Sequence, residues 1–253
     1  MTSFQADYGR AEICPSPNHG ERLGVERPDI LLLHYTGMPS AEGAQTWLCT
    51  PESQVSSHYI VHEDGRVVQM VPESRRAWHA GKSVWAGETD INSRSNGIEI
   101  ANAGHPAGLP DYPDVQVESV IQLCLECVQR HRIAPERVLA HSDVAPIRKV
   151  DPGENFPWDR LYRAGVGHWV EPAPIGGGRF FQRGDRGQPV EALQSMLSLY
   201  GYGIDITGDF CAQTEGVVAA FQRHFRQAKV DGVADSSTIE TLHRLLTSLS
   251  RFR

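Results

Sequence analysis

The sequence contains no apolar run long enough to cross a membrane. A helical span requires about 18 consecutive apolar residues, and the most apolar stretch here, ILLL at residues 30–33, is far shorter. The first residues, MTSFQADYGRAE, also lack the basic segment followed by an apolar one that marks a secretory signal. From these two absences we expect a protein without a membrane span and with a cytoplasmic location.

The chain also lacks an excess of positive charge. Its 24 Lys and Arg residues are outnumbered by 31 Asp and Glu residues, for a net charge of −7, so we expect no nucleic-acid partner. The charge is uneven along the chain. Residues 1–178 carry 15 basic and 23 acidic side chains, whereas residues 179–253 carry 9 and 8. This difference predicts a domain boundary near residue 178.

A disulfide framework is missing as well, because the five cysteines are odd in number and scattered. Cys124 and Cys127 form the one CxxC pattern, inside a stretch with helical periodicity, where residues three apart share a face. We interpret them as buried structural thiols, with a metal or redox role as the alternative.

The first two thirds of the chain mixes short apolar runs with helical stretches. Runs that predict strands lie at residues 30–35, 59–61, 67–71, 97–102 and 138–140, and Asp64–Gly65 predicts a hairpin between the second and third of them. Periodic stretches predict helices at 41–49, 115–132 and 156–165. Residues 74–97 have no long periodic segment and predict a lid or groove wall. The expected fold class is α+β, with a central mixed sheet flanked by helices.

The last third predicts a small three-helix unit. Residues 166–178, VGHWVEPAPIGGG, are rich in Gly and Pro and are typical of an interdomain linker. Beyond them an internal repeat places Gly208 six residues before Thr214 and Gly232 six residues before Thr238. Each Gly suits a tight turn, and each Thr suits the start of a helix.

Three side chains could form a metal site. His34 and His141 each end a predicted strand, and Asp151 follows in a Pro-containing loop. Strand ends of one sheet can lie along one edge, so these groups can converge. Zinc hydrolases use three such ligands and keep a fourth position for water. The alternative for either histidine is an ordinary surface or core position.

Two further residues could carry the chemistry. Glu99 is a lone carboxylate between Ile98 and Ile100; it is either a general base in a groove or a solvated side chain on the outer face. Lys149 could offset charge on a developing oxyanion, or it could simply be exposed to solvent.

Residues 30–157 resemble a known enzyme family. The matching strings, in order, are LLLHYT, SSHYIVHEDGRVVQMVPE, AWHAG, SNGIEIAN and HSDVAPIRKVDPG. They resemble the zinc-dependent N-acetylmuramoyl-L-alanine amidases of the amidase-2 family, and within it the bacterial branch of muropeptide-recycling and wall-acting enzymes. The resemblance implies a hydrolase that cleaves the amide between N-acetylmuramic acid and L-alanine in peptidoglycan or muropeptides.

The same resemblance implies roles for individual residues. One Zn²⁺ per chain would be held by His34, His141 and Asp151. Glu99 would be the catalytic carboxylate, and Lys149 would stabilise the transition state. Four residues fall in segments that line the substrate groove: Trp78, His79, Asn92 and Asn102. One departure is Ile147, where the family often has Gly; it could change the backbone angles of the loop.

Residues 184–246 resemble the peptidoglycan-binding domain type 1, in the strings GDRGQPVEALQSMLSLYGY, TGDF, VVAAFQ and KVDGVADSST. Together the resemblances predict a catalytic domain at 1–165, a linker at 166–178 and a peptidoglycan-binding domain at 179–253. A small helical domain with another partner is the alternative for the last part.

Two questions stay open at this point. A wall-binding module suits the periplasm or cell envelope, which is the alternative to the cytoplasm. A non-catalytic peptidoglycan receptor is the alternative function, although receptors of this fold typically lack a metal ligand. The sequence does not distinguish intact wall from soluble anhydro-muropeptides as substrate, nor does it indicate an oligomeric state.

Overall fold

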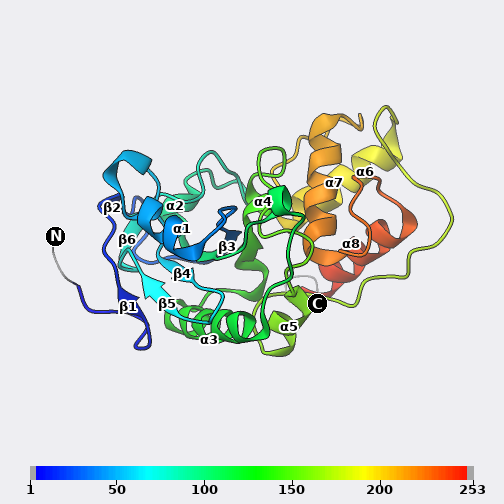
Figure 1. The fold of residues 1–253 in the computed structure, drawn as a ribbon. Helices are drawn as coiled ribbons and strands as arrows, with labels where there is room; N and C mark the ends of the chain where they lie inside the picture. The colour runs from blue at the N-terminus through cyan, green and yellow to red at the C-terminus, as the bar shows by residue number, and fades with distance from the viewer. Residues whose placement is uncertain (1–3, 250–253) are drawn as a thin grey trace.

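The computed structural model describes residues 4–249, which are built around a six-stranded mixed sheet (Figure 1). Its strands, in spatial order, are β1 (Glu12–Ile13), β5 (Val67–Gln69), β4 (Tyr59–Val61), β7 (Ser95–Ile100), β3 (Ile30–Tyr35) and β8 (Val138–Ala140). The hairpin pair β4 and β5 is antiparallel and the other neighbours are parallel. The predicted α+β class and the predicted hairpin are confirmed.

A second, two-stranded sheet joins β2 (His19–Glu21) to β6 (Arg75–Ala77). Together with α2 (Ile91–Arg94), β6 lies in the stretch predicted to be a loop. That part of the prediction was therefore incomplete. Short 3₁₀ helices occupy Pro51–Ser53, His105–Ala107 and Pro135–Arg137.

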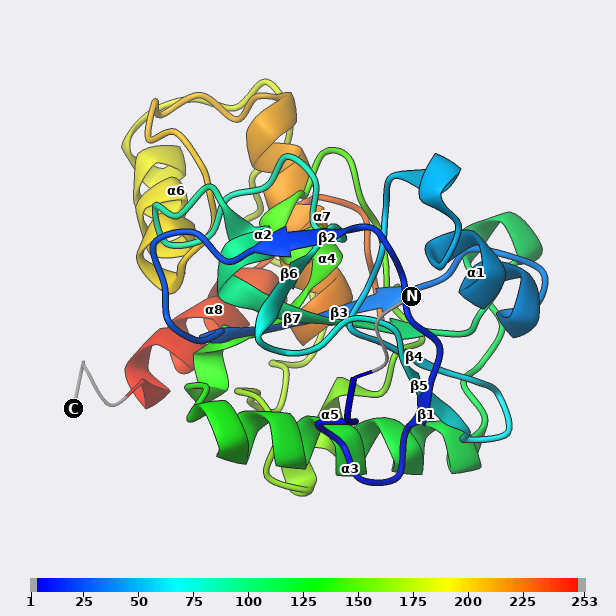
Figure 2. The same cartoon turned by 90° about the vertical axis from the view of Figure 1, so that its left-hand side faces the viewer.

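One face of the large sheet packs on the long helix α3 (Asp114–His131). Residues alternate along each strand, so Leu31, Leu33 and their neighbours on β7 face this helix. Cys124 and Cys127 are fully buried on the same side, as expected for structural thiols. Figure 2 shows α3 on one side of the sheet and α1 (Ala41–Leu48) on the other.

The opposite face of the sheet is covered by two groups of residues. At one end, Ala44 and Leu48 of α1 pack on Ile60 and Val68. At the other end, Leu32 belongs to a hydrophobic cluster that runs without interruption into the C-terminal helices. These helices are α6 (Gln188–Tyr200), α7 (Ala212–Phe225) and α8 (Ser236–Ser248). The short α4 (His141–Val144) lies between the sheet and α7 (Figure 1), and α5 (Trp158–Arg163) follows it in the chain.

The contact between the sheet and the C-terminal helices is polar as well as apolar. Asp143 of α4 is fully buried and accepts hydrogen bonds from the Tyr202 hydroxyl (2.7 Å) and from Nδ1 of His224 (2.7 Å). His224 in turn stacks on Trp158, with ring centroids 3.7 Å apart. Tyr202 and His224, from the C-terminal part of the chain, therefore supply hydrogen-bond donors to a carboxylate that is buried in the catalytic part.

The predicted linker is folded against the C-terminal unit. The backbone of Ala173 donates to Thr241 Oγ1 (3.0 Å) and accepts from Ser237 Oγ (2.6 Å), and Ala173 is buried. We keep the division at 1–165, 166–178 and 179–253 as a proposal, and residues 1–3 and 250–253 lie outside the described part.

The internal repeat corresponds to two similar turns. Gly208 and Gly232 have φ angles of 71° and 73°, a region that favours glycine. Thr214 and Thr238 lie in the first turns of α7 and α8. A helix thus follows each of these two turns, as the repeat predicts.

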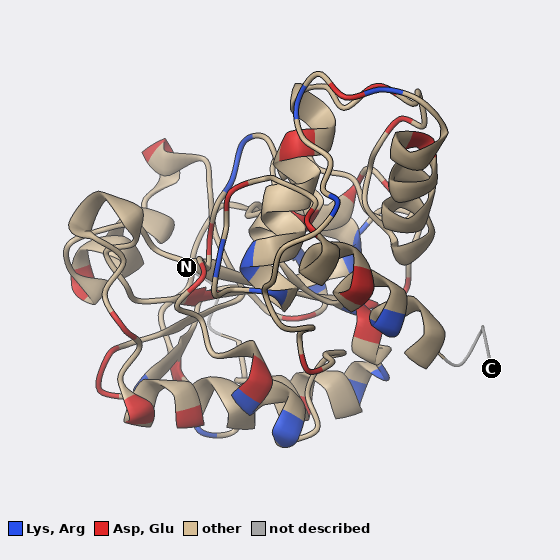
Figure 3. Cartoon of the chain, turned by 90° about the vertical axis from the view of Figure 1, so that its right-hand side faces the viewer, with Lys and Arg blue, Asp and Glu red and all other residues tan. Residues whose placement is uncertain are grey.

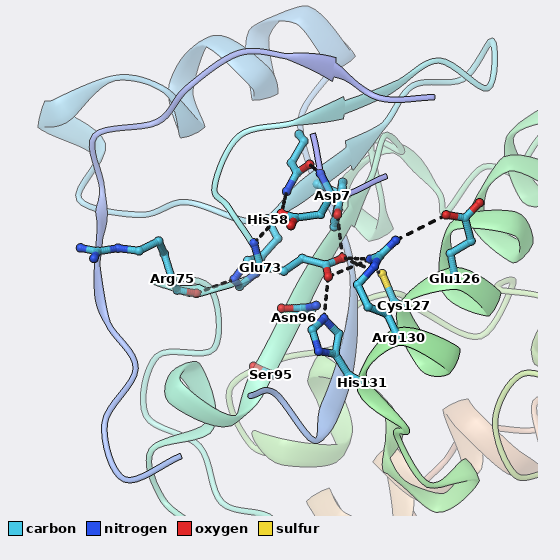
Figure 4. Close-up of polar contacts among 12 residues, drawn as sticks. Asp7, His58, Glu73, Arg75, Ser95, Asn96, Glu126, Cys127, Arg130 and His131 are labelled. Carbon is cyan, nitrogen blue, oxygen red and sulfur yellow. Dashed lines mark hydrogen bonds and ion pairs between the residues drawn. The ribbon is translucent and has the colours of Figure 1, made fainter. Parts of the chain in front are cut away.

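A buried ionic cluster anchors the end of α3 (Figure 4). The Glu73 carboxylate accepts hydrogen bonds from Arg130 (2.7 and 2.8 Å), from Nε2 of His131 (2.5 Å) and from the Tyr59 hydroxyl (2.7 Å). Burial alone would raise the pKa of Glu73, but these hydrogen bonds outweigh it and lower the pKa to about 2. Glu73 therefore links the C-terminal turn of α3 to the segment after β5.

Charged residues of both signs are interspersed along the ribbon (Figure 3).

Within residues 4–249, none of the helices combines the length and the apolar character that a bilayer crossing requires.

Candidate metal centre

The sheet register brings His34 and Glu99 side by side. These two residues are direct partners in the parallel pairing of β3 and β7, so their side chains project from the same face. On the other side of β3, Leu33 pairs with Ala140. His141 follows immediately and begins α4, which places it beside His34.

Three potential metal ligands converge at this edge. His34 Nδ1 lies 2.9 Å from His141 Nδ1 and 3.1 Å from Asp151 Oδ2, and His141 Nδ1 lies 3.0 Å from Asp151 Oδ2. All three side chains are buried. The Asp151 carbonyl accepts from Ser142 N (3.1 Å), which fixes the loop against α4. The structure thus brings together the three residues that the sequence singled out.

The hydrogen bonds around His141 leave one ring nitrogen free to bind a metal. Its Nε2 lies 3.0 Å from the carbonyl oxygen of Ala80. A carbonyl can only accept, so we assign the proton to Nε2. The lone pair of Nδ1 then points to the position that His34 and Asp151 also face.

A chain of hydrogen bonds gives His34 the same tautomer. The Ser95 hydroxyl donates its proton to the carbonyl oxygen of Ile91 (2.6 Å), so it must accept from Nε2 of His79 (3.2 Å). Nδ1 of His79 is then an acceptor and receives the proton of His34 Nε2 (3.0 Å). This leaves His34 Nδ1 with a lone pair toward Asp151.

Electrostatics favour the protonation states that bind a metal. Burial and the neighbouring His141 lower the pKa of His34 to about 4, against the opposing effect of Asp151. Burial would raise the pKa of Asp151, but the two histidines outweigh it and hold that pKa well below its usual range. His34 is therefore neutral and Asp151 ionised near neutral pH. Two imidazole lone pairs and a carboxylate facing one point fit a divalent cation of the zinc type.

Glu99 lies beside this cluster and is partly exposed to the cavity, while its Oε2 atom is shielded and has no hydrogen-bond partner within residues 4–249. Desolvation and the charge of Asp151 raise its pKa well above the usual range, and Lys149 opposes this effect. A hydrogen-bond donor or a cation that enters the cavity would stabilise the ionised form of this carboxyl.

The cluster forms the floor of a cavity of about 530 Å³. Glu99, Lys149, Trp78 and His79 are among the residues that line it. Other lining residues gave no sequence signal of their own: Tyr35, Met38, Trp47, Val55 and Arg148. Their positions depend on how α1 and the loops pack.

Asn92 and Asn102 lie outside the lining of this cavity. Asn92 Oδ1 accepts from the backbone N–H groups of His79 (3.0 Å) and Ala80 (2.8 Å), so it holds the segment that contacts both histidines. Asn102 donates to the carbonyl of Pro110 and accepts from the backbone N–H of Gly104.

Ile147 is accommodated without a glycine-like backbone. It is not among the described residues with positive φ, and its side chain is 71% exposed. It lies against Gly216 of α7, where an added Cβ atom would come within 3.2 Å of Ile147 Cγ1. The residues that follow Ile147, from Arg148 to Asp151, line the cavity.

Comparison with protein families places this geometry in context. Residues 24–154, which contain all three converging ligands, match the Amidase_2 family, described as N-acetylmuramoyl-L-alanine amidase. The chain belongs to this family. Residues 186–242 match the putative peptidoglycan binding domain.

Individual relatives extend the similarity over most of the chain. The N-acetylmuramoyl-L-alanine amidase AmiD of Escherichia coli is 36% identical over 235 residues, covering 87% of this chain and 83% of that protein. Its structure in complex with the substrate anhydro-N-acetylmuramic acid-L-Ala-D-gamma-Glu-L-Lys superposes with a TM-score of 0.74 at 33% identity, covering 90% of this chain and 97% of the other. A structure of AMPDH3 from Pseudomonas aeruginosa with anhydromuramic pentapeptide gives a TM-score of 0.72 at 29% identity, covering 96% and 98%.

Proposed function

We propose that this protein is a zinc-dependent N-acetylmuramoyl-L-alanine amidase that hydrolyses the amide between the lactyl group of N-acetylmuramic acid and L-alanine. The observation that supports this most strongly is the convergence of His34, His141 and Asp151, within 3.1 Å of one another, on the floor of a cavity that also contains Glu99. In a chain of this family, such a site suits amide hydrolysis.

The three ligands would hold one Zn²⁺ per chain. When bound, zinc polarises a carbonyl and lowers the pKa of water toward neutrality. Glu99 would accept a proton from the attacking water and pass it to the leaving nitrogen. Its raised pKa makes its carboxylate a stronger base, and the charge of a bound Zn²⁺ would favour that ionised form. The Lys149 ammonium would offset negative charge on the carbonyl oxygen of the substrate.

We propose a substrate contact for Trp78 and supporting roles for His79, Asn92 and Asn102. Trp78 lines the cavity and offers an apolar surface to the substrate. Both ring nitrogens of His79 are occupied by His34 and Ser95, so its role is to orient His34. Asn92 supports the backbone next to His79, and Asn102 shapes the loop at Gly104.

The relatives and the C-terminal unit support a substrate class, while the compartment stays a proposal. The curated relatives are bacterial proteins, and two structures with anhydromuropeptides superpose on this chain. We propose muropeptides or peptidoglycan as the substrate and the cytoplasm as the site of action, with the periplasm or cell envelope as the alternative.

Product analysis tests the proposal. The full-length protein is incubated in parallel with purified sacculi and with soluble anhydro-muropeptide, and the products are analysed by mass spectrometry. Free stem peptides that begin with L-alanine support the amidase. Elemental analysis should find one zinc per chain. Metal-free protein that binds muropeptides and releases no peptide would instead identify a receptor.

A further inference from the structure

Two partly buried cysteines from different parts of the chain meet in the catalytic unit. Cys14 Sγ lies 3.5 Å from Cys49 Sγ, and Cys49 Sγ also lies 3.3 Å from the carbonyl oxygen of Cys14. Cys14 directly follows β1, and Cys49 caps the C-terminal end of α1. Both are free and neither is fully buried. They are separated by 35 positions in the sequence.

Hydrogen bonds on both sides of the pair hold the two segments together. The backbone N–H of Cys14 donates to the Gln69 carbonyl (3.0 Å), which fixes the first segment on the sheet. Ser16 Oγ donates to the carbonyl of Leu48 (2.6 Å), the residue just before Cys49. The proximity of the two sulfur atoms is thus built into the packing of the N-terminal segment on α1.

The remaining cysteines do not compete for this contact. Cys124 and Cys127 are fully buried inside α3, and Cys211 is exposed at the start of α7. Within residues 4–249, the Cys14–Cys49 contact is the one direct approach of two sulfur atoms at hydrogen-bonding distance.

We propose that Cys14 and Cys49 are a modification site, at which a disulfide bond forms under oxidising conditions. The co-reactant is a disulfide such as oxidised glutathione. One cysteine thiolate attacks it and releases one thiolate, and the second cysteine attacks the resulting mixed disulfide and releases the other. One S–S bond forms in the protein, two thiol protons are lost, and two electrons reduce the co-reactant to two thiols. The sulfur atoms must approach from 3.5 Å to about 2.05 Å.

The bond would fix one wall of the catalytic cavity. Trp47 and Leu48, in the last turn of α1, line that cavity, and Cys49 is the next residue. A covalent link from Cys49 to the N-terminal segment would restrain the end of α1 in oxidising surroundings. The same wall would be held only by hydrogen bonds and packing in a reducing compartment.

The reaction should be slow at neutral pH. Burial, together with the Cys14 thiol beside it, raises the pKa of Cys49 to about 12. The thiolate is the reactive form, so the rate of disulfide formation should increase as the pH is raised from 7 to 9.

The test uses the full-length protein incubated with oxidised glutathione. Free thiols are counted after denaturation, and disulfide-linked peptides are identified by mass spectrometry. We expect the count to fall from the five cysteines of the sequence to three, with a peptide that links Cys14 to Cys49. The thermal midpoint should rise by about 5–10 °C. Reduction should reverse both changes.

Matched variants complete the experiment. In Cys49→Ser, oxidant should produce no intramolecular disulfide, and the thermal midpoint should not respond to oxidant. In Cys211→Ser, both responses should be retained. Five remaining thiols, separate glutathione adducts on Cys14 and Cys49, or a link that involves another cysteine would each overturn the proposal.

Discussion

At the scale of single residues, metal binding at the candidate site would depend on the positions of the imidazole protons as well as on the three side chains. His34, His141 and Asp151 can bind a cation only if both Nδ1 atoms carry lone pairs. The Ala80 carbonyl ensures this for His141, and the path through His79 to Ser95 ensures it for His34. Residues that never touch a metal can therefore control its binding.

The first prediction concerns His79. His79→Phe keeps the ring shape but removes the acceptor for His34 Nε2, so the zinc affinity should fall by about 10–100-fold. Competition with a chromogenic chelator measures this without any assay of activity. His243→Phe, on the exposed side of α8, is the control and should bind zinc normally. Equal affinities in the two variants would rule out the positioning role.

The second prediction concerns Glu99. Glu99→Gln preserves the shape of the side chain but cannot accept a proton, so kcat should fall by about 100- to 10,000-fold while zinc content stays at one per chain. Glu63→Gln, at an exposed position in the hairpin turn, should behave as the unmodified protein. A Glu99→Gln enzyme with nearly normal turnover would contradict the proposed mechanism.

At the scale of elements, some parts of the fold could be predicted from the sequence and others could not. ILLLHY, the Asp64–Gly65 turn and the long periodic stretch of α3 carry strong local signals, and each element is present where expected. β1, β2 and β6, with the sequences EI, HGE and RRA, are as short as the predicted strands or shorter, and they lack the apolar runs that marked those strands. They exist because partner strands pair with them.

The same limit applies to the site. The ends of two neighbouring strands and a stiff loop suggested His34, His141 and Asp151 as possible ligands, and the family resemblance singled them out. The supporting role of Asn92 was not predictable, because it depends on where the chain after β6 passes α2. The family resemblance implied a segment that lines the groove, and the structure places the Asn92 side chain against the backbone of His79 and Ala80.

The third prediction tests the link between α3 and the segment after β5. The pKa of Glu73 is lowered from 4.5 to about 2 by folding, so its contribution to stability is full above pH 4.5 and is lost as the pH falls toward 2. Glu73→Gln should lower the free energy of unfolding by about 3 kcal/mol at pH 7.

Urea denaturation at pH 7, 5 and 3 measures this difference, which should shrink at the lowest pH. Glu118→Gln, at an exposed position on α3, should change the free energy of unfolding by about 0.5 kcal/mol or less. A Glu73→Gln penalty that does not depend on pH would mean that the carboxylate charge is not responsible.

At the scale of the whole molecule, the sheet and the C-terminal helices share one hydrophobic core. Trp85, from the long segment before β7, lies in that core with Tyr200 and Tyr202 of the C-terminal unit. The sequence predicted two units and a linker from composition and charge. It could not show that apolar residues of both units face each other, because such contacts have no local pattern.

The fourth prediction follows from the shared core. Calorimetry of the full chain should show one unfolding transition. Tyr202→Phe leaves buried Asp143 without one of its donors and should destabilise that transition by about 1–3 kcal/mol. Tyr162→Phe, at a position that is 45% exposed, is the control. Two separate transitions, with only one of them shifted by Tyr202→Phe, would show that the units unfold independently.

The buried contact of Asp143 with Tyr202 and His224 would affect how the enzyme acts on an insoluble polymer such as the cell wall. A module on a flexible tether lets an enzyme reach many bonds around one attachment point. Here the Asp143 hydrogen bonds and the shared apolar cluster hold the C-terminal helices against the catalytic unit, so in this arrangement a wall strand bound to them would meet the cavity at one offset. Each further cut would require the whole molecule to detach or to slide along the polymer.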